Sequence, residues 1–370
     1  MRKILFAILC PLLLSSFIFC TCSSESTDPT LAEEMQKTLD NALNEYDLMG
    51  LSAAIIMPDQ PNWSGVSGYS YDTTPITSDM LFYMESITKS YVAALVLHLS
   101  AEGLLTLEDS LDMWLPEYRY IDGCITIRQL LNHSSGVFDF SEHPTIWDEI
   151  MADLHRSWSP EEVITNFVLE PYFEPGTGWY YSNTNYFLLG MVIVEVTGSE
   201  LSAELRQRFF NPLGLNNTFL AGEDDITGEL AHGWYDLDMD GDLDDFSIIP
   251  RTAIDSLAWA AGGLVSTAED NALWASYLFG GDILEQEQLD QMLDFIAFNS
   301  ETRTGYGLGT CRFNYCNQTL WGHTGGGIDF SAILFYLPDE EVSFTVMCNQ
   351  VDEGVISAGT DLLQTYLNFK

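Results

Sequence analysis

Residues 84–97 read MESITKSYVAALVL, and the second half of this stretch is apolar on every side. A helix that is apolar all round is normally buried, so we expect a central core helix over residues 86–102. Ser86 and Lys89 stand three residues apart at its start, which places both side chains on one face. The chain has only four lysines, two of them at residues 3 and 370. A lysine inside an apolar helix therefore calls for a chemical explanation.

Composition bounds the class of protein. The 370 residues are 46% hydrophobic and 13% aromatic, which is enough for a large core and excludes a disordered chain. The chain has 55 acidic and 13 basic residues, which gives a net charge of −42. Such a charge repels nucleic acid and anionic membrane surfaces. We therefore exclude both as direct partners of the folded domain. The charge has two interpretations: a solvated acidic surface or adaptation to high salt, where screening relieves self-repulsion.

The N-terminus predicts export. Arg2 and Lys3 precede an apolar run at residues 4–19 that is short for a membrane span, so we interpret residues 1–22 as an export signal. Residues 23–30 form a serine-rich tether. Cys20 or Cys22 resembles the lipid acceptor of a bacterial lipoprotein, so lipidation and simple cleavage both stay open. We expect a periplasmic, cell-envelope or secreted protein, with membrane contact only through an N-terminal lipid.

Residues 31–370 read as one domain without a linker or repeat. An amphipathic helix at 31–47 and strands at 51–57 and 63–71 come first, helical patterns fill the middle, and strands follow residue 304 before a last helix. We predict an α+β fold: an α/β sandwich whose antiparallel sheet is flanked by helices from both chain ends. Its α/β part covers about 31–85 and 304–370, and a mostly helical inserted subdomain covers about 86–303. We expect a monomer.

The cysteines leave disulfide pairing open. Cys311 and Cys316 flank a short polar turn and could be joined across a hairpin, and Cys316 with Cys348 is the rival pairing. Cysteine and histidine spacings of a zinc site are absent from the sequence.

Three short motifs carry candidate chemistry. Serine is a poor nucleophile until a neighbour takes its proton, so Ser86 needs a base such as Lys89. The start of a helix also offers free N–H groups that favour a developing oxyanion. Further along, PGTGWYYSNTNY contains Tyr181 and Asn183 after a glycine-rich turn, and WGHTGGG lies in a strand-rich segment. The last motif contains His323, Thr324 and Gly325.

These motifs, in this order, resemble the serine β-lactamase and D-alanyl-D-alanine carboxypeptidase superfamily, on the branch of class C β-lactamases and their esterase and peptidase relatives. Five further stretches, among them ITIRQLLNHSSGV and AGGLVSTAEDNALW, also resemble family segments, and the likeness runs from residue 31 to 370. The resemblance implies a β-lactamase/transpeptidase-like fold. It also implies hydrolysis through an acyl-enzyme, without a metal or organic cofactor for catalysis.

The resemblance assigns roles residue by residue. Ser86 matches the acylated nucleophile, Lys89 its base or proton relay, and Tyr181 the tyrosine that takes and returns protons. Asn183 matches the residue that orients substrate and lysine. The remaining matches are His323, Thr324 and Gly325 for substrate orientation, and the backbone N–H groups of Ser86 and Gly326 for the oxyanion hole.

The location of the proton is open at this point. Burial would push Lys89 towards its neutral form, while a cationic Lys89 beside Tyr181 would favour the phenolate. The net charge of −42 opposes a neutral lysine, so desolvation must dominate locally. We therefore expect Lys89 and Tyr181 to titrate as one coupled unit.

Three residues bear on substrate preference. His323 stands where many relatives have lysine and carries only a partial charge near neutral pH, so we expect weak dependence on a substrate carboxylate. This shifts the expected substrates from β-lactams towards esters or D-amino-acid peptides. Arg312 is interpreted as a surface arginine, with carboxylate binding as the alternative. Asp329 departs from the family's Gly-Phe pair, and it either alters substrate preference or points to solvent.

A separate signal is DLDMDGDLDD at residues 236–245. Asp236, Asp238, Asp240 and Gly241 match the opening of a calcium loop, although Ser247 stands where glutamate is expected. The interpretations are a structural calcium site and a solvated acidic loop. His133, in HSSGV, is expected to shape a turn beside the site.

The sequence thus predicts an exported serine hydrolase that forms an acyl-enzyme at Ser86. Its substrates would be amides or esters: D-Ala-D-Ala-type peptides, small esters or β-lactams. The alternative is a catalytically silent cell-envelope binding protein of the same fold.

Overall fold

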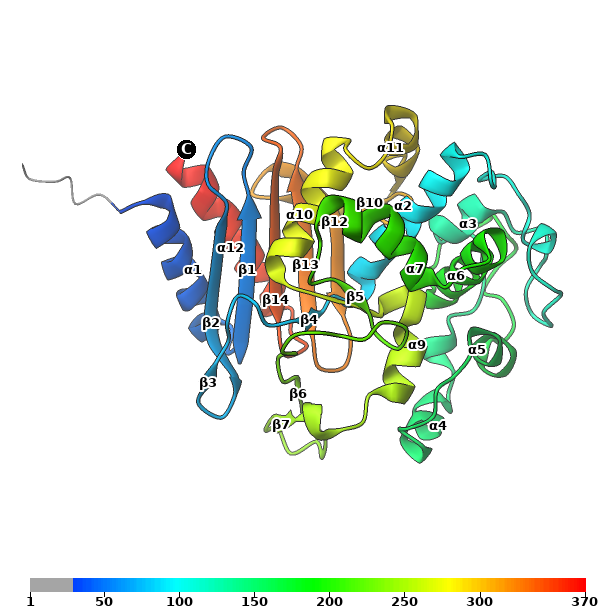
Figure 1. The fold of residues 1–370 in the computed structure, drawn as a ribbon, viewed down its shortest axis with the longest axis horizontal. Coiled ribbons are helices and arrows are strands. Elements are labelled where there is room, and N and C mark those ends of the chain that lie inside the picture. Colours follow the sequence, from blue (N-terminus) through cyan, green and yellow to red (C-terminus); the bar gives the residue numbers. More distant parts are fainter. Residues whose placement is uncertain (1–28) are drawn as a thin grey trace, which may run out of the picture.

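The computed structural model describes residues 29–370. The predicted export signal and most of the tether lie outside the described residues. Within them, a nine-stranded sheet and a set of helices form two regions that Figure 1 shows side by side, the sheet to the left and the helices to the right. The α+β fold class predicted from the sequence is confirmed by this architecture.

The sheet is antiparallel and runs in the order β3-β2-β1-β14-β13-β12-β11-β10-β9. Both chain ends contribute to it, because β1 lies directly beside β14. The strands are β1 (Gly50–Ile56), β2 (Trp63–Tyr71), β3 (Thr74–Pro75), β9 (Ile296–Ala297), β10 (Arg303–Tyr306), β11 (Cys311–Tyr315), β12 (Gln318–Gly326), β13 (Ser331–Leu337) and β14 (Val342–Cys348). Small sheets join β4 (Phe82–Tyr83), β8 (Leu264–Ser266) and β5 (Phe219–Leu220), and β6 (Trp234–Tyr235) with β7 (Asp244–Asp245).

Side chains that alternate between the two faces of the central strands belong to two separate hydrophobic cores. On β13, Ile333, Phe335 and Leu337 pack with helices α1 (Leu31–Glu45) and α12 (Gly354–Phe369). The intervening Leu334 and Tyr336 face the other core, which includes α10 (Ala268–Gly280). Because side chains alternate across a strand, one sequence covers both faces of the sheet. In Figure 1, α12 runs behind the strands and α10 in front of them.

The structure departs from the predicted boundary of the helical region at helix α10. This helix lies inside residues 86–303, yet it packs on the sheet: Ser343 of β14 donates to the Ala272 carbonyl at 2.7 Å. The inserted region therefore returns to the sheet before its predicted end. Its other helices are α2 (Thr88–Ala101), α3 (Ile127–Leu131), α4 (Ile146–Ala152), α5 (Pro160–Phe167), α6 (Asn183–Thr197), α7 (Leu201–Leu205), α8 (Asn211–Leu213), α9 (Thr252–Gly262) and α11 (Gln286–Met292).

Helix α2 is the buried helix that the sequence predicts. Eleven of its fourteen residues are buried, Lys89 among them. A 3-10 turn, η1 (Glu85–Ile87), leads into it, so Ser86 lies in the turn before the helix. No single helix within residues 29–370 is long and apolar enough to cross a membrane, although the bent pair 183–197 and 201–213 passes by length and composition together.

Neither predicted disulfide forms. All four cysteines of the described chain are free. Cys311 begins β11 and Cys316 follows its last residue, about 16 Å away along the extended strand, whereas a disulfide needs Cα atoms roughly 4.4–6.8 Å apart. Cys348 lies on β14, three strand spacings or about 14 Å from β11. The segment between Cys311 and Cys316 is a strand and not the turn that favoured the first pairing, and the turn begins only at Cys316.

Candidate active site

The structure brings Ser86 and Lys89 together where the sheet meets the helical region. The Met84 N–H donates to the Leu264 carbonyl at 2.9 Å, and the Leu264 N–H donates to the Thr88 hydroxyl at 3.1 Å. These bonds fix η1 and the first turn of α2 against β8. Lys89 is fully buried, and its Nζ lies 3.0 Å from Ser86 Oγ.

Lys89 has three oxygen partners, and only one of them can donate. Its Nζ lies 2.8 Å from Asn183 Oδ1 and 2.6 Å from the Ala261 carbonyl, besides its contact with Ser86. An amide oxygen and a carbonyl can only accept, so both take N–H groups from lysine. The lone pair of a neutral amine is thereby left towards the Ser86 hydroxyl, which can donate. This arrangement suits Lys89 to remove the proton from Ser86.

Asn183 orients the lysine from the first turn of α6. Its Nδ2 donates to Asp139 Oδ2 at 3.1 Å, which directs Oδ1 towards Lys89. Asp139 is buried, and it also accepts from the backbone and hydroxyl of Ser141. Asp139 was not predicted from the sequence; the only local signal was its position as cap of a short turn at residues 140–142.

Burial sets the protonation of the lysine. Desolvation lowers the pKa of Lys89 to about 7, and the nearby Asp139 and Glu85 offset only part of this. A substantial fraction of the side chain is therefore neutral at physiological pH, as a base requires.

Tyr181 lies next to this pair but is not bonded to it. Lys89 Nζ sits 4.9 Å from the centre of the Tyr181 ring, which packs on His133 with ring centres 4.3 Å apart. The buried phenol oxygen has no hydrogen-bond partner in the described chain. Desolvation raises the pKa of Tyr181 well above its usual value. Of the two groups, Lys89 loses its proton first.

His323 cannot present a charge to substrate. Its Nδ1 donates to the Thr324 carbonyl at 2.6 Å, and its Nε2 lies 3.2 Å from the Tyr306 hydroxyl. His133 Nδ1 faces two donors, the Ser182 N–H and the Asn185 amide, so its Nε2–H points to Tyr306 at 3.1 Å. Tyr306 must then donate to His323. Burial lowers the pKa of His323 to about 3, so the partial charge expected from the sequence is absent.

The other residues of the WGHTGGG motif lie in different parts of the structure. Thr324 Oγ1 accepts from Arg303 at 3.0 Å and lines a separate hollow beside α12. Gly325 packs so closely that an added Cβ would lie 2.2 Å from the Met84 carbonyl oxygen. Gly326 lines the same cavity as Ser86, as the oxyanion prediction requires. Arg312 bonds the backbone and hydroxyl of Thr304 and does not line that cavity.

The cavity beside Ser86 has a volume of about 250 Å³. Its walls combine polar groups near the serine with an apolar side, and the latter includes Phe140, Ile146, Trp147, Ile150, Ile254 and Leu257. Asp329 does not point to solvent: it is buried behind this cavity, where its Oδ2 accepts from Arg251 Nη1 at 2.6 Å. That interpretation of Asp329 was wrong because its partner stands 78 residues away in the sequence.

Comparison with known proteins agrees with this geometry. The Beta-lactamase family model matches residues 34–365. The chain belongs to the beta-lactamase family of serine hydrolases. Penicillin-binding protein 4* of Bacillus subtilis is 25% identical over 292 residues, covering 75% of this chain and 63% of that protein. Esterase EstB of Burkholderia gladioli is 31% identical over 217 residues, covering 53% of this chain and 55% of the esterase. The chain thus spans little more than half of these relatives.

Two solved structures of the family cover nearly the whole chain. D-amino acid amidase from Ochrobactrum anthropi SV3, complexed with L-phenylalanine amide, has a TM-score of 0.81 at 29% identity, over 91% of this chain and 99% of that one. D-stereospecific amidohydrolase from Streptomyces sp. has a TM-score of 0.78 at 29% identity, over 90% and 98%. The resemblance read from the sequence is therefore confirmed.

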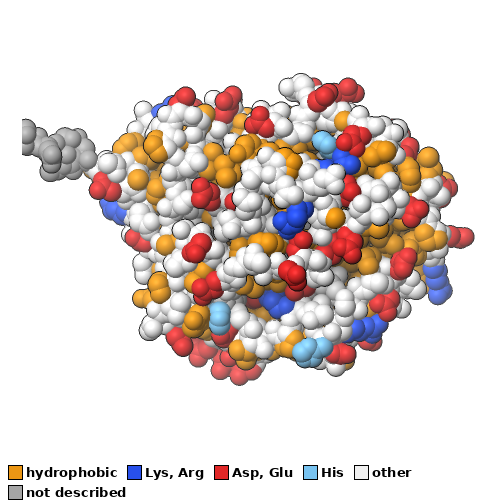
Figure 2. Space-filling view, in the orientation of Figure 1, with side chains coloured by type: hydrophobic (Ala, Val, Ile, Leu, Met, Phe, Trp, Pro, Cys, Tyr) orange, Lys and Arg blue, Asp and Glu red, His pale blue; other side chains and the backbone are white. Residues whose placement is uncertain are grey.

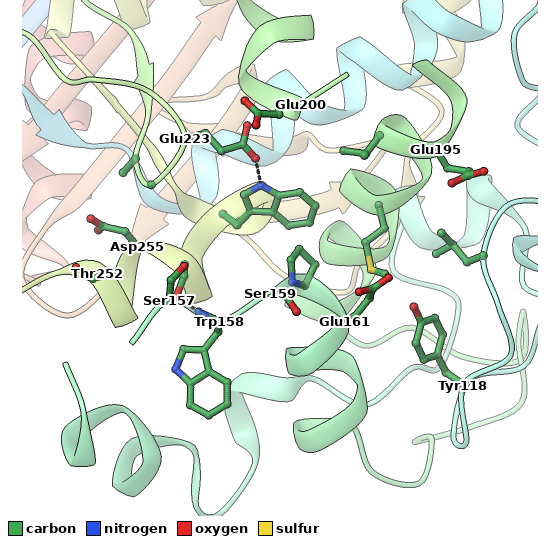
Figure 3. A pocket seen from close by; sticks show the side chains of 18 of the residues that line it. Tyr118, Ser157, Trp158, Ser159, Glu161, Glu195, Glu200, Glu223, Thr252 and Asp255 are labelled. Carbon is green, nitrogen blue, oxygen red and sulfur yellow. Dashed lines mark hydrogen bonds between the residues drawn. The ribbon is translucent and has the colours of Figure 1, made fainter. Parts of the chain in front are cut away.

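A larger cavity of about 600 Å³ lies on the other side of α9 (Figure 3). Ile254 and Ala258 of this helix line the Ser86 cavity together with Arg251, which precedes the helix, whereas Asp255 and Trp259 line the larger cavity. The Trp259 indole donates to Glu223 Oε1 at 2.5 Å, and Trp259 adopts a left-handed φ of 28° where α9 is broken. The Ala261 carbonyl that accepts from Lys89 follows two residues later, so this break positions it.

The acidic loop gathers a different set of carboxylates from the one predicted. Oxygens of Asp236, Asp238 and Asp244 lie within 4.8 Å of one another. The Asp240 carboxylate instead accepts from the Asp242 N–H at 2.9 Å. Asp244 replaces Asp240 because the chain returns through β7. Calcium binding here stays a prediction.

Figure 2 shows acidic side chains distributed over the visible face, with only isolated basic ones. On that face the acidic side chains are therefore spread over many positions and not gathered in one patch.

Proposed function

We propose that this protein hydrolyses amides and esters of small amino-acid derivatives, D-configured ones first, through an acyl-enzyme at Ser86. Lys89 Nζ takes the hydroxyl proton as Ser86 Oγ attacks the carbonyl carbon. The N–H groups of Ser86 and Gly326 receive the developing negative charge. Tyr181, a buried neutral phenol beside the pair, donates a proton to the leaving group and recovers one from the Lys89 ammonium, after which water hydrolyses the acyl-enzyme. Asn183 keeps the lysine in place.

The observation that carries this proposal is the set of partners around Lys89. Two obligate acceptors and one hydroxyl leave the amine a single direction for proton transfer, towards Ser86. The catalytically silent alternative gives no reason for a buried lysine with its pKa lowered to about 7.

The choice of substrate has two supports. His323 is neutral and buried, so it provides no positive charge to a β-lactam or peptide carboxylate. Arg251 reaches the cavity but is already paired with Asp329 and Asp255. Of the two solved relatives described above, one is named a D-amino acid amidase and the other a D-stereospecific amidohydrolase, and an amino-acid amide carries no such carboxylate.

Labelling and a substrate panel test the proposal. A fluorescent fluorophosphonate should label the wild type and Ser64→Ala, in which an exposed serine is lost, but not Ser86→Ala. The panel contains phenyl acetate, D- and L-phenylalanine amide, and a chromogenic cephalosporin. We expect the ester and the D-amide to be hydrolysed faster than the cephalosporin. Equal labelling of Ser86→Ala would refute the nucleophile, and a cephalosporin turned over far faster than the ester would refute the substrate preference.

A further inference from the structure

Glu85 is an unpartnered carboxylate directly beside the nucleophile. It precedes Ser86 in the chain and lines the same cavity. Within residues 29–370, its carboxylate accepts no hydrogen bond and forms no ion pair. The nearby Arg251 is committed elsewhere, to Asp329 at 2.6 Å and Asp255 at 3.4 Å. Because Glu85 is only partly buried and lines the cavity, its carboxyl group is open to a partner that arrives with the substrate.

The charges around Glu85 leave room for a cation. Glu85, Asp255 and Asp329 surround one guanidinium, that of Arg251. Asp329 Oδ1 is buried without a hydrogen-bond partner, a second sign of unmet acceptor capacity. Three carboxyl groups share one fixed positive charge, so a cation that arrives with the substrate would favour the ionised form of Glu85.

The backbone is built to hold this carboxylate in position. Glu85 has a left-handed φ of 53°, which is uncommon for a residue with a long side chain. Gly327 makes the space that the side chain occupies, because an added Cβ there would lie 2.2 Å from Glu85 Oε1. Gly262 stands on the other side, with its Cβ position 3.6 Å from Oε2. Two glycines thus flank the carboxylate at the mouth of the site.

The rest of the cavity suits an apolar group. Ile146, Trp147, Ile150 and Leu257 form its far wall. A substrate that carries an ammonium group and an apolar side chain next to its reactive carbonyl would satisfy both walls. An amino-acid amide or ester with a free amino group has this combination.

We propose that Glu85 binds the ammonium group of the substrate and so selects amino-acid derivatives with a free N-terminus. This inference rests on the proposed acyl transfer at Ser86. Glu85 is then a specificity-determining residue, and the ammonium fills the position that Arg251 leaves open.

Binding of the substrate ammonium group should change the number of protons held by the protein. Burial raises the pKa of Glu85 to about 8, with Asp329 and Asp255 adding to the rise and Arg251 and Lys89 opposing it. An ammonium beside Glu85 favours the carboxylate form. Binding of an amine near pH 7 should therefore release a proton from the protein, and the observed heat of binding should depend on the ionisation enthalpy of the buffer.

The kinetic test compares D-phenylalanine methyl ester with its N-acetyl derivative. Both are esters, so the test does not depend on amidase activity. The ratio of their kcat/KM values should favour the free amine in the wild type and fall at least about tenfold in Glu85→Gln, the loss expected for one charge-assisted hydrogen bond. Glu287→Gln, which removes an exposed carboxylate on α11, should keep the wild-type ratio.

A binding test separates this inference from the proposed function. Calorimetry measures phenethylamine and its neutral analogue 2-phenylethanol on wild type, Glu85→Gln and Ser86→Ala. Tighter binding of the amine to wild type and Ser86→Ala, lost in Glu85→Gln, would support the ammonium site even without hydrolysis of any ester. An unchanged ratio in Glu85→Gln, or equal binding of amine and alcohol to the wild type, would overturn the inference whatever the catalytic result.

Discussion

Replacing Asp139 by asparagine should move the acid limb of the pH–rate profile to lower pH. In the wild type, the base form of Lys89 appears as pH rises through about 7, and acylation should follow it. Asp139 stabilises the ammonium form through Asn183, which bonds both side chains. Removing this negative charge disfavours the ammonium, so the pKa of Lys89 should fall further and more free amine should be present at acidic pH.

The magnitude follows from the geometry. Asn183 separates the two charges by one amide group, with hydrogen bonds of 3.1 Å and 2.8 Å on either side. At a separation on the order of 7 Å and an effective dielectric constant of about 20, the attraction is about 2 kcal/mol. This corresponds to a shift of roughly one to two pH units. Asparagine can still cap the turn at residues 140–142, so the fold should persist.

The assay is kcat/KM for phenyl acetate between pH 5 and 9, corrected for spontaneous hydrolysis. The midpoint of the acid limb should lie near 7 in the wild type and in Glu287→Gln, and one to two units lower in Asp139→Asn. At pH 5.5 the variant should retain a larger share of its own plateau activity. A midpoint that stays in place or rises would refute the assignment of Lys89 as the base that titrates.

Three further predictions concern stability and metal binding. The pKa of His323 is lowered to about 3 from an unfolded value near 6.5, so its contribution to stability is present above 6.5 and is lost as pH falls. Urea unfolding should show about 2 kcal/mol less loss between pH 7 and 5 in His323→Gln than in the wild type or the exposed control His155→Gln; an identical loss in all three would contradict the neutral assignment. Trp259→Phe removes a bond to a carboxylate and should lower the unfolding free energy by about 1.5–3 kcal/mol in the same assay, whereas an unchanged midpoint would speak against that bond. Calorimetry with Ca²⁺ should show binding to the wild type, weakened more by Asp244→Ala than by Asp240→Ala, and no heat from the wild type would leave a solvated loop as the correct reading.

Local features of the sequence predicted the features of the fold and site that are themselves local. Ser86 and Lys89 meet because three residues span one turn, and this holds wherever a helix forms. The apolar runs after residue 304 likewise form strands, among them β13 and β14. Such inferences depend on backbone periodicity alone, and the structure agrees with them.

The errors lie where a distant residue decides the outcome. His323 is neutral because Tyr306 donates to it, and Tyr306 donates because His133 already faces two other donors. No spacing within WGHTGGG could reveal this series of hydrogen bonds. Asp329 is buried only because Arg251 reaches it from the start of α9. Glu85 did have a local signal, since it is the one charged side chain in the run FYMESI.

The lone core lysine also shows which electrostatic effect is stronger. A protein of net charge −42 should hold protons tightly, yet the pKa of Lys89 falls from 10.5 to about 7. Surface carboxylates act through water and salt, which screen them beyond about 8–10 Å. Removal of water from the ammonium acts at contact distance and is not screened, and Lys89 has no exposed surface at all. Asp139 and Glu85 are close enough to oppose it, and Cys311 adds a smaller effect in the same direction. The proton on Lys89 is thus controlled by its buried neighbours within the site and not by the charge of the distant surface.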